Sequence, residues 1–344
     1  MIQGLTWVST TRHCVTIEVT MLLRQYRLCN HIVAKQLPLL QLKTYFTEST
    51  SDKETLKTVP PSSTFSLTHQ HSLTNNSLKH KLTTNQPLRG MHTTFYGDTS
   101  HIEQVGLLGY DFLWAEAEHS SASPESIERM ILAAERRGLP TVVRVGYGYQ
   151  NIIGHIQKYL TSGAVGIILP QCETAEDAFK LVEAVKFPPL GRRGLAGDRW
   201  NNWGLGSGGS MKKRVEDANN NSVCGVMIEN RTGLNNLEAI LKVEGIDFVS
   251  FGPTDLSADL GFAGEIRHPE VVAMVEEASK KILAAGKATG TIVLNQQDYE
   301  YWRTRGHQVI CCVAQHIFVE AAKNVIDQMD EYEGVCDDVC VEKT

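Results

Sequence analysis

Two carboxylates follow apolar runs at points where strands would end. Glu229 comes directly after the run at residues 223–228, and Asp255 lies four residues beyond the run at 247–251. Two carboxylates brought together can hold a hard divalent cation such as Mg²⁺ or Mn²⁺, with water and substrate oxygens in the other coordination positions. A pair of exposed loop acids or helix caps is the alternative, and these two residues by themselves leave it open.

A histidine and an arginine stand at similar positions. His119 follows another apolar run and lies three residues after Glu116, so it could act as a general base near neutral pH with its ring oriented by the neighbouring acid. Arg144 lies in the valine-rich run 141–145, and a buried guanidinium needs an anionic partner because it cannot lose its charge. The alternatives are a hydrogen-bonded loop histidine and a structural ion pair between Arg144 and Glu116 or Glu229.

The elements that must position these residues recur along the chain from residue 90 onward. Short β-rich runs alternate with helical segments at about the 20- to 30-residue spacing of βα units, which predicts a parallel sheet. Eight runs are present, at residues 91–95, 111–115, 141–145, 165–169, 223–228, 247–251, 290–294 and 307–313. We therefore predict an α/β fold with a closed, TIM-like (β/α)₈ barrel, in which residues at the C-terminal ends of the strands converge.

Helix boundaries are marked between these runs. Ser123 before Pro124 and the capping-box pattern that begins at Thr174 predict two helix starts. Residues 269–285 and 296–305 predict two more helices, each followed by a glycine. These signals agree with the helices that βα units require.

Residues 186–221 depart from this rhythm. We predict that they form a long βα loop of the kind that covers an active site. Their glycine run at 204–209 resembles a dinucleotide-binding fingerprint, but it neither follows a clear strand nor opens a strong helix, so no nucleotide is expected. Trp200 and Trp203, together with the segment 146–149, could line an aromatic pocket wall, or they could pack within the surface loops.

Composition indicates a globular chain with a buried core, because 42% of the 344 residues are hydrophobic and 21% are charged. No uninterrupted apolar run approaches the roughly 18 residues of a membrane-spanning helix, so we expect a soluble protein with no membrane partner. Residues 1–47 carry five basic residues against one acidic residue, whereas the body from residue 75 is acidic within a net charge of -6. An acidic body argues against nucleic acid as a partner, because phosphate binding needs clustered Lys and Arg.

The first part of the chain differs in character from the rest. Of the 31 residues from 47 to 77, 14 are Ser or Thr, which indicates a linker. We predict a disordered or targeting extension with this linker at 1–74, a barrel at 75–335 and a short tail at 336–344. The eight cysteines show no paired C-x-x-C spacing, which favours a reduced, cytoplasmic location. A mitochondrial location follows instead if the basic extension is a transit peptide.

A series of motifs in fixed order carries a resemblance to a known family. The motifs are Gly109-Tyr110-Asp111-Phe112 with Glu118-His119, Val143-Arg144-Val145, Phe187-Pro188-Pro189-Leu190-Gly191, Val243-Glu244-Gly245-Ile246-Asp247, Gly252-Pro253-Thr254-Asp255-Leu256-Ser257 and Ala284-Ala285-Gly286-Lys287-Ala288. With them, residues 75–332 resemble the HpcH/HpaI family of metal-dependent (class II) 2-oxo-acid aldolases. The resemblance implies a TIM-like barrel whose final helix is often exchanged between subunits, in a homo-oligomer that is commonly a hexamer built as a trimer of dimers.

The resemblance also implies an activity and a set of site residues. The protein would be a carbon–carbon lyase that reversibly cleaves a 4-hydroxy-2-oxo acid to pyruvate and an aldehyde through a metal-stabilised enolate. The cofactor would be Mg²⁺ or Mn²⁺, with Co²⁺ as a further candidate, and neither a nucleotide nor a Schiff-base lysine would be needed. The implied residues are the metal ligands Glu229 and Asp255, the substrate-binding and enolate-stabilising Arg144, the base His119, its orienting acid Glu116, and the amides of Gly252 and Thr254 for the substrate carboxylate.

Three positions depart from the family's pattern. Glu116 stands where the family's aldolases usually have Asp, and Met227 stands where many have Gln. Thr161 replaces an Asp that usually raises the basicity of the histidine. The core chemistry is retained on these residues, whereas the identity of the aldehyde does not transfer.

Two other functions compete with aldol cleavage. Oxaloacetate decarboxylation, or a macrophomate-synthase-like reaction, would use the same enolate and release CO₂ without an aldehyde product. A non-catalytic barrel scaffold is the alternative from a different class. The retained acids, arginine and histidine argue against the scaffold.

Overall fold

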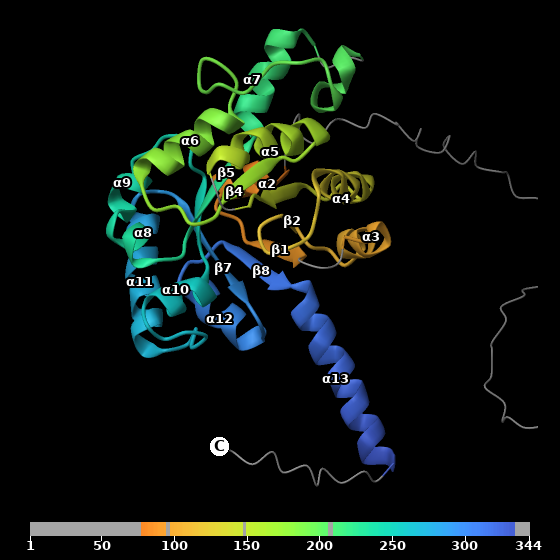
Figure 1. The fold of residues 1–344 in the computed structure, drawn as a ribbon, viewed down its shortest axis with the longest axis vertical. Coiled ribbons are helices and arrows are strands. Elements are labelled where there is room, and N and C mark those ends of the chain that lie inside the picture. The colour runs from red at the N-terminus through yellow and green to blue at the C-terminus, as the bar shows by residue number, and fades with distance from the viewer. Residues whose placement is uncertain (1–76, 94–96, 147–148, 206–208, 334–344) are drawn as a thin grey trace, which may run out of the picture. The chain divides into compact units, whose positions relative to one another are not determined.

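The computed structural model describes residues 77–93, 97–146, 149–205 and 209–333. Within them the chain forms a closed barrel of eight parallel strands in chain order, with β8 hydrogen-bonded to β1 (Figure 1). The strands are β1 (Leu88–Thr93), β2 (Phe112–Glu116), β3 (Thr141–Arg144), β4 (Gly166–Leu169), β5 (Val223–Ile228), β6 (Phe248–Phe251), β7 (Ala288–Val293) and β8 (Val309–Val313). The predicted (β/α)₈ barrel is therefore confirmed.

Several sequence predictions fall outside the described residues. They concern the extension 1–74, the tail 336–344, Tyr147 and Gly148 of the proposed aromatic wall, and the centre of the glycine run at 206–208. These predictions stay as they were stated.

The described helices mostly lie around the outside of the strands, although the last one extends away from them (Figure 1). They are α2 (Ser77–Thr83), α3 (Thr99–Leu107), α4 (Pro124–Arg136), α5 (Tyr149–Ser162), α6 (Ala175–Val185), α7 (Met211–Asn221), α8 (Arg231–Asn235), α9 (Leu237–Leu241), α10 (Pro253–Asp259), α11 (Pro269–Ala284), α12 (Gln296–Thr304) and α13 (Ala314–Glu333). Ser123 Oγ accepts the Ser126 N–H at 3.2 Å at the start of α4, and Thr174 and Asp177 form a reciprocal capping box at the start of α6. The predicted helix starts are thus confirmed.

The first strand begins earlier than predicted, at Leu88 instead of Met91. The three residues that the prediction left out, 88–90, include no β-branched side chain, and one of them is Gly90. A Cβ at Gly90 would lie 2.4 Å from the Phe112 ring and 2.5 Å from Cys311 Sγ. Glycine is therefore needed here by close packing against the side chains of both neighbouring strands, and that packing is not visible in a local pattern.

Residues 186–221 also differ from the prediction. They connect the end of α6 to the start of β5. They therefore begin at the N-terminal ends of the strands, opposite the ends that carry the candidate site residues. They contain the 3₁₀ helix η1 (Arg199–Gly204) and the helix α7, and the prediction of a βα loop over the site is wrong. Trp200 is buried against Phe187, with ring centroids 4.8 Å apart, whereas Trp203 is exposed. Trp200 therefore packs within this segment itself.

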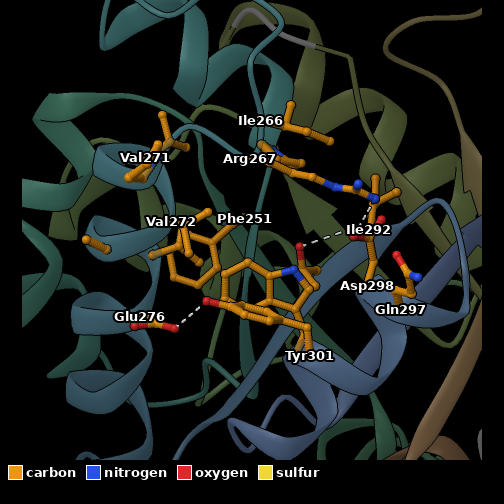
Figure 2. Close-up of a pocket in the computed structure, with 16 residues that line it drawn as sticks. Phe251, Ile266, Arg267, Val271, Val272, Glu276, Ile292, Gln297, Asp298 and Tyr301 are labelled. Carbon is orange, nitrogen blue, oxygen red and sulfur yellow. Dashed lines mark hydrogen bonds and ion pairs between the residues drawn. The ribbon is translucent and has the colours of Figure 1, made fainter.

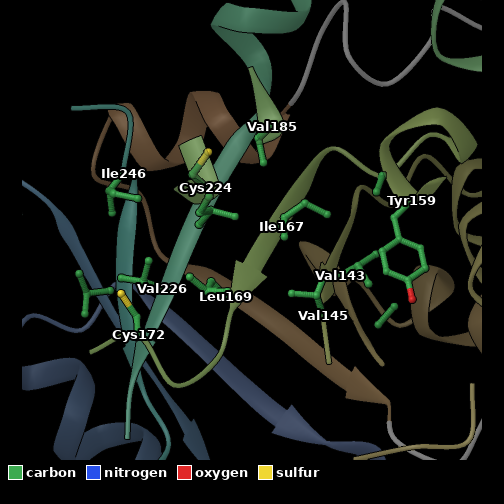
Figure 3. Packing of buried hydrophobic residues seen from close by; sticks show 14 of the residues in the cluster. Val143, Val145, Tyr159, Ile167, Leu169, Cys172, Val185, Cys224, Val226 and Ile246 are labelled. Carbon is green, nitrogen blue, oxygen red and sulfur yellow. The ribbon is translucent and has the colours of Figure 1, made fainter. Parts of the chain in front are cut away.

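Side chains alternate between the two faces of each strand, as an extended chain requires. On β3, Val142 belongs to the cluster that fills the barrel, and Val143 belongs to the cluster between strands and helices. Figure 3 shows part of this outer cluster, with Ile167 and Val226 from the next strands. The inward-facing series continues at the C-terminal strand ends with Glu116 on β2, Arg144 on β3 and Glu229 directly after β5.

The last helix, α13, leaves the barrel from the end of β8 instead of packing back on it (Figure 1). Its exposed apolar residues are Ile317, Phe318, Val319, Val325, Ile326, Met329 and Tyr332. None of the helices in the described ranges is long and apolar enough to cross a membrane.

Candidate active site

Glu116 is the most highly connected acid at the C-terminal end of the barrel. Its Oε1 accepts the backbone N–H groups of Glu118 at 2.6 Å and His119 at 2.9 Å. Its Oε2 accepts Nε of Arg144 at 2.7 Å and contacts Nε2 of His92 at 2.8 Å. Burial alone would raise the pKa of Glu116, but the hydrogen bond from His92 and the charge of Arg144 outweigh it and lower the pKa to about 2. Glu116 is therefore a stable anion that holds the turn carrying His119.

Arg144 is buried among three acids. Beyond its bond to Glu116, its Nη1 lies 3.2 Å from Oε2 of Glu118 and 3.8 Å from Oε1 of Glu229. Nη1 also lies 3.6 Å from Sδ of Met227. Burial would lower the pKa of this guanidinium, but the surrounding carboxylates raise it, with Glu116 first among them. The ion pairs that the sequence suggested for Arg144 with Glu116 and Glu229 are both present.

Glu229 follows β5 and is 2% exposed. Its Oε2 accepts the backbone N–H of Gln171 at 2.8 Å, and Gln171 holds a left-handed φ of 49° that few non-glycine residues adopt. No described residue donates a hydrogen bond to its Oε1. Burial raises the pKa of Glu229 to about 7, aided by the charges of Glu118 and Asp255 and opposed by the Gln171 amide and Arg144. Arg144 is thus its positive neighbour, at 3.8 Å, but does not donate a hydrogen bond to it.

Glu118 is a second acid at this end of the barrel whose pKa is raised by burial. Burial raises its pKa to about 7; Arg144 opposes this rise, whereas Glu116 and Asp255 add to it. Its Oε2 lies 3.7 Å from Nε2 of His119, and the same His119 atom lies 4.0 Å from Oδ2 of Asp255. The His119 and Asp255 side chains are 59% and 45% exposed. The imidazole therefore faces Glu118 and Asp255 at the open end of the barrel, and Glu116 contacts the His119 backbone instead of its ring.

A family model supports the inference from this geometry. The model of the HpcH/HpaI aldolase/citrate lyase family matches residues 97–313, which include every candidate site residue. The chain belongs to this family. The family predicted from the sequence motifs is confirmed, as is the expectation that the protein is a lyase.

Individual members of the family support the same conclusion. The chain is 36% identical to the hydroxypyruvate/pyruvate aldolase of Roseobacter denitrificans, over 63% of this chain and 82% of that protein. It is 33% identical to the 2-keto-3-deoxy-L-rhamnonate aldolase of Klebsiella pneumoniae, over 54% of this chain and 68% of that protein. A crystal structure of an HpcH/HpaI aldolase/citrate lyase family protein from Burkholderia cenocepacia covers 74% of this chain and 99% of its own, at 28% identity and a TM-score of 0.68.

The residues at the barrel end fit a divalent cation of the kind that the HpcH/HpaI resemblance implies. Oε1 of Glu229 is buried and accepts no hydrogen bond within the described residues, and Asp255 is close enough to raise its pKa. A Cβ at Gly252 would lie 2.1 Å from that oxygen, so a side chain here would occupy the space beside it. The described ranges contain no group of three or more His, Cys, Asp or Glu side chains placed to hold a metal ion. The predicted pair needs only two carboxylates, because water and substrate oxygens supply the other ligands.

The two predicted amide donors lie at the start of α10. Gly252 is the N-cap residue of this helix, and Thr254 lies in its first turn. The N–H of Gly252 donates to the Ile228 carbonyl at 3.4 Å, which is a long hydrogen bond. The Thr254 amide is therefore the better candidate for holding a substrate carboxylate.

The positions that depart from the family pattern differ in their distance from the site. Met227 contacts Arg144, so it occupies the position at which a polar side chain would have met the guanidinium. Thr161 lies on α5, where its hydroxyl accepts a hydrogen bond from Gln157 at 3.3 Å. The third position, Glu116, has a side chain one methylene longer than that of Asp, and its carboxylate makes four polar contacts.

Three residues with functional contacts were missed as site residues by sequence reasoning. His92 lies on β1 and contacts Glu116, Gln171 lies after β4 and contacts Glu229, and Glu118 contacts Arg144. Leu88 faces the inside of the barrel, and His92, four residues later on the same strand, faces the same way. A prediction that started the first strand at Leu88 would therefore have placed His92 inside the barrel. Gln171 acts through its backbone, and side-chain type gives no signal for that.

A pocket of about 520 Å³ lies elsewhere, beside β6 and β7 between α11 and α12 (Figure 2). Its polar side chains are paired with one another. Arg267 donates to Asp298 at 2.8 Å, and Tyr301 donates to Glu276 at 2.7 Å. The chemistry-bearing residues at the barrel end do not line it, so this pocket and the candidate active site are different places.

Proposed function

We propose that the protein is a divalent-metal-dependent aldolase that reversibly cleaves a 4-hydroxy-2-oxo acid to pyruvate and an aldehyde. The observation that carries the proposal is the position of Arg144, whose Nη1 lies 3.2 Å from Glu118 and 3.8 Å from Glu229 at the C-terminal end of the barrel. A fixed cation beside Glu229, one of the two proposed metal ligands, supports the proposal. The two aldolase relatives support the class of reaction.

Aldol cleavage needs a base and a group that stabilises an enolate. The C3–C4 bond breaks, the C4 hydroxyl loses its proton, and the electron pair stays on pyruvate as its enolate. His119 is the proposed base, because its imidazole is exposed at the barrel end and faces the other site residues. Arg144 stabilises the enolate oxygen, because its guanidinium is held in place before the reaction begins. In the condensation direction His119 returns the proton.

A divalent cation, Mg²⁺ or Mn²⁺, would be held by Glu229 and Asp255. When bound it would act as a Lewis acid toward the 2-oxo acid. Glu229 is kept in position by the Gln171 amide, and Thr254 would donate its backbone N–H to the substrate carboxylate. No lysine is required for this chemistry.

The test is proton–deuterium exchange of the pyruvate methyl group, followed by NMR with Mg²⁺ or Mn²⁺ and with EDTA. The proposal expects exchange with metal and none with EDTA, and no metal-dependent exchange in Glu229→Gln. Exchange that is insensitive to EDTA would contradict metal dependence. Absence of exchange in protein shown to bind Mn²⁺ would support the scaffold. Release of CO₂ from oxaloacetate without an aldehyde reaction would favour decarboxylation.

We further propose that α13 packs on a second copy of the chain. In a barrel of this type the helix after each strand packs on the outside, but α13 extends away and leaves its apolar residues exposed. A pocket of about 340 Å³ lies beside β1 and β8, and Leu108, Tyr110, Tyr299 and Ile310 are among its lining residues. A helix from another copy would fill this place. A trimer of dimers is the larger assembly that we propose on this basis.

For location we propose the cytoplasm, with the mitochondrion as the alternative if the basic extension targets the protein. Cys172, Cys224 and Cys311 are buried free thiols, which suits a reducing compartment. Cell fractionation of the full chain distinguishes the two locations.

A further inference from the structure

We propose that His92 is a positioning residue of this site, holding Glu116 so that Arg144 turns its terminal nitrogens toward the substrate. The kinetic part of this inference rests on the proposed function. The geometric part does not, because it concerns contacts within the protein itself.

His92 and Arg144 share one oxygen of Glu116. Nε2 of His92 lies 2.8 Å from Oε2, and Nε of Arg144 donates to the same atom at 2.7 Å. His92 is 5% exposed, so water does not compete freely for this contact. An ionised carboxylate only accepts hydrogen bonds, so Nε2 of His92 carries the hydrogen.

The remaining oxygen of Glu116 is also fully used. Its Oε1 accepts the backbone N–H groups of Glu118 and His119. A carboxylate offers about four acceptor positions, and these four donors occupy them. Glu116 therefore has no further position for a second nitrogen of Arg144.

This saturation decides how Arg144 is oriented. Arginine and carboxylate often form a two-point pair, which would draw two guanidinium nitrogens onto Glu116. Here Arg144 contacts Glu116 through Nε, and its Nη1 faces Glu118 and Glu229 instead. His92 thus keeps the terminal nitrogens on the side where the substrate is expected.

The fold holds the His92 ring in place. In the register of β1 and β2, His92 is paired with Trp114, and the two rings meet edge to face with centroids 5.8 Å apart. The next pair of strands places Glu116 opposite Arg144. Glu116 lies two residues beyond Trp114 on β2, and the side chains of His92 and Arg144 reach it from the strands on either side.

Loss of the His92 donor has a specific expected effect. An acceptor position on Oε2 becomes vacant, and Arg144 can fill it with a terminal nitrogen. The guanidinium then turns away from Glu229, and its charge is no longer directed at the enolate oxygen. Turnover falls, whereas metal affinity is maintained because Glu229 and Asp255 are unchanged.

The test uses three variants at one position. His92→Gln places an amide N–H near the position of Nε2, His92→Asn is too short to do so, and His92→Phe removes the donor. His307→Phe is the matched control, because His307 is also buried but lies two residues before β8, where it hydrogen-bonds Ser279 of α11.

Two readouts are measured on the full chain. For pyruvate methyl exchange with Mn²⁺, we expect kcat to fall about 10- to 100-fold in His92→Phe and His92→Asn, with KM and Mn²⁺ affinity within about 3-fold of wild type. We expect His92→Gln to retain at least about a third of wild-type kcat. The second readout is the ¹⁵N NMR chemical shift of the Arg144 Nε–H group, whose resonance is assigned by its loss in Arg144→Lys. We expect this chemical shift to change in the Phe and Asn variants and to stay at its wild-type value in the Gln variant.

The outcomes separate this inference from the proposed function. Equal losses in the Gln and Asn variants, or wild-type kcat in His92→Phe, overturn the positioning role. A kcat loss in His307→Phe as large as in His92→Phe also overturns it, because a buried histidine in general would then explain the effect. If the wild-type protein exchanges no pyruvate protons, the proposed function fails and the NMR readout alone decides. An Arg144 resonance unchanged by His92→Phe then refutes the contact.

Discussion

Arg144 donates from Nε to Oε2 of Glu116 at 2.7 Å, and both side chains are almost fully buried. This single contact fixes the guanidinium at one edge and leaves its Nη1 beside Glu118 and Glu229. A buried charge without such partners would be very costly, so the acids are what keep the cation inside the barrel. The same acids hold the charge at the end of the barrel where the proposed reaction would use it.

Replacing Arg144 by Lys should impair both catalysis and stability. An ammonium group carries its three N–H donors on one nitrogen, so it cannot reproduce contacts that Arg144 makes through Nε to Glu116 and through Nη1 to Glu118. We expect kcat for pyruvate exchange to fall about 10²- to 10³-fold and the free energy of unfolding to fall by about 2 kcal/mol. Arg129→Lys is the control, because Arg129 is exposed in an i,i+4 pair with Glu125. Equal rates in the two variants would remove Arg144 from the mechanism.

Replacing Gly252 by Ala should weaken metal binding. The added Cβ would lie 2.1 Å from Oε1 of Glu229 and force that carboxylate to move. We expect the Mn²⁺ dissociation constant, measured by electron paramagnetic resonance, to rise at least about tenfold. Gly154→Ala on α5 is the matched control, because a Cβ there meets nothing within 4 Å. Unchanged Mn²⁺ affinity in Gly252→Ala would argue against Glu229 as a ligand.

Removing the imidazole of His119 should slow proton transfer while metal binding persists. We expect His119→Ala to lower kcat for aldol cleavage by about 10²- to 10⁴-fold, with Mn²⁺ affinity within about threefold of wild type. The side chain is more than half exposed, so the variant should unfold at nearly the wild-type temperature. Wild-type turnover would assign the base to another group.

The free energy of unfolding should depend on pH through His307, which lies at the end of the barrel opposite the candidate active site. Burial lowers the pKa of His307 to about 4, below the 6.5 of an unfolded chain. The neutral ring therefore stabilises the fold above about pH 6.5, and this contribution is lost as the pH falls toward 4, by up to about 3 kcal/mol. His307→Gln should lack this dependence in urea unfolding between pH 7.5 and 4.5.

The comparison with the variant is needed because two acids of the candidate active site change stability with pH in the opposite direction. Glu118 and Glu229 have raised pKa values of about 7. In metal-free protein, their neutral forms therefore stabilise the fold below about pH 4.5, and this stabilisation is lost as the pH rises to 7. Only the difference between wild type and His307→Gln isolates the histidine. Identical pH slopes in both proteins would contradict the buried neutral state.

Charged residues on α13 should disrupt the assembly. Ile326→Asp with Met329→Asp places two carboxylates on the exposed apolar part of the helix. We expect the subunits to separate in sedimentation velocity experiments, because the packing proposed for α13 would bury these charges. Leu132→Asp is the control, since Leu132 is exposed on α4. An unchanged assembly in the double variant would exclude this part of the helix from the interface.

Local pattern in the amino-acid sequence was sufficient for the barrel and for the main candidate residues. The apolar alternation in Val142 and its neighbours, and caps such as Ser123 and Thr174, depend on residues a few positions apart. For this reason the strands and helix starts were predicted well. Glu116, Arg144 and Glu229 followed from their place at strand ends, because parallel strands bring those ends to one side.

The contacts between the candidate site residues are formed only when the barrel closes. His92 meets Glu116 across 24 residues of chain, and Gln171 meets Glu229 across 58. No local pattern encodes such distances, since they arise only when neighbouring strands align in register and the helices return the chain. The same reason explains why Glu118 was missed as a site residue and why residues 186–221 were assigned to the wrong side. Their roles depend on where distant strands place them in space.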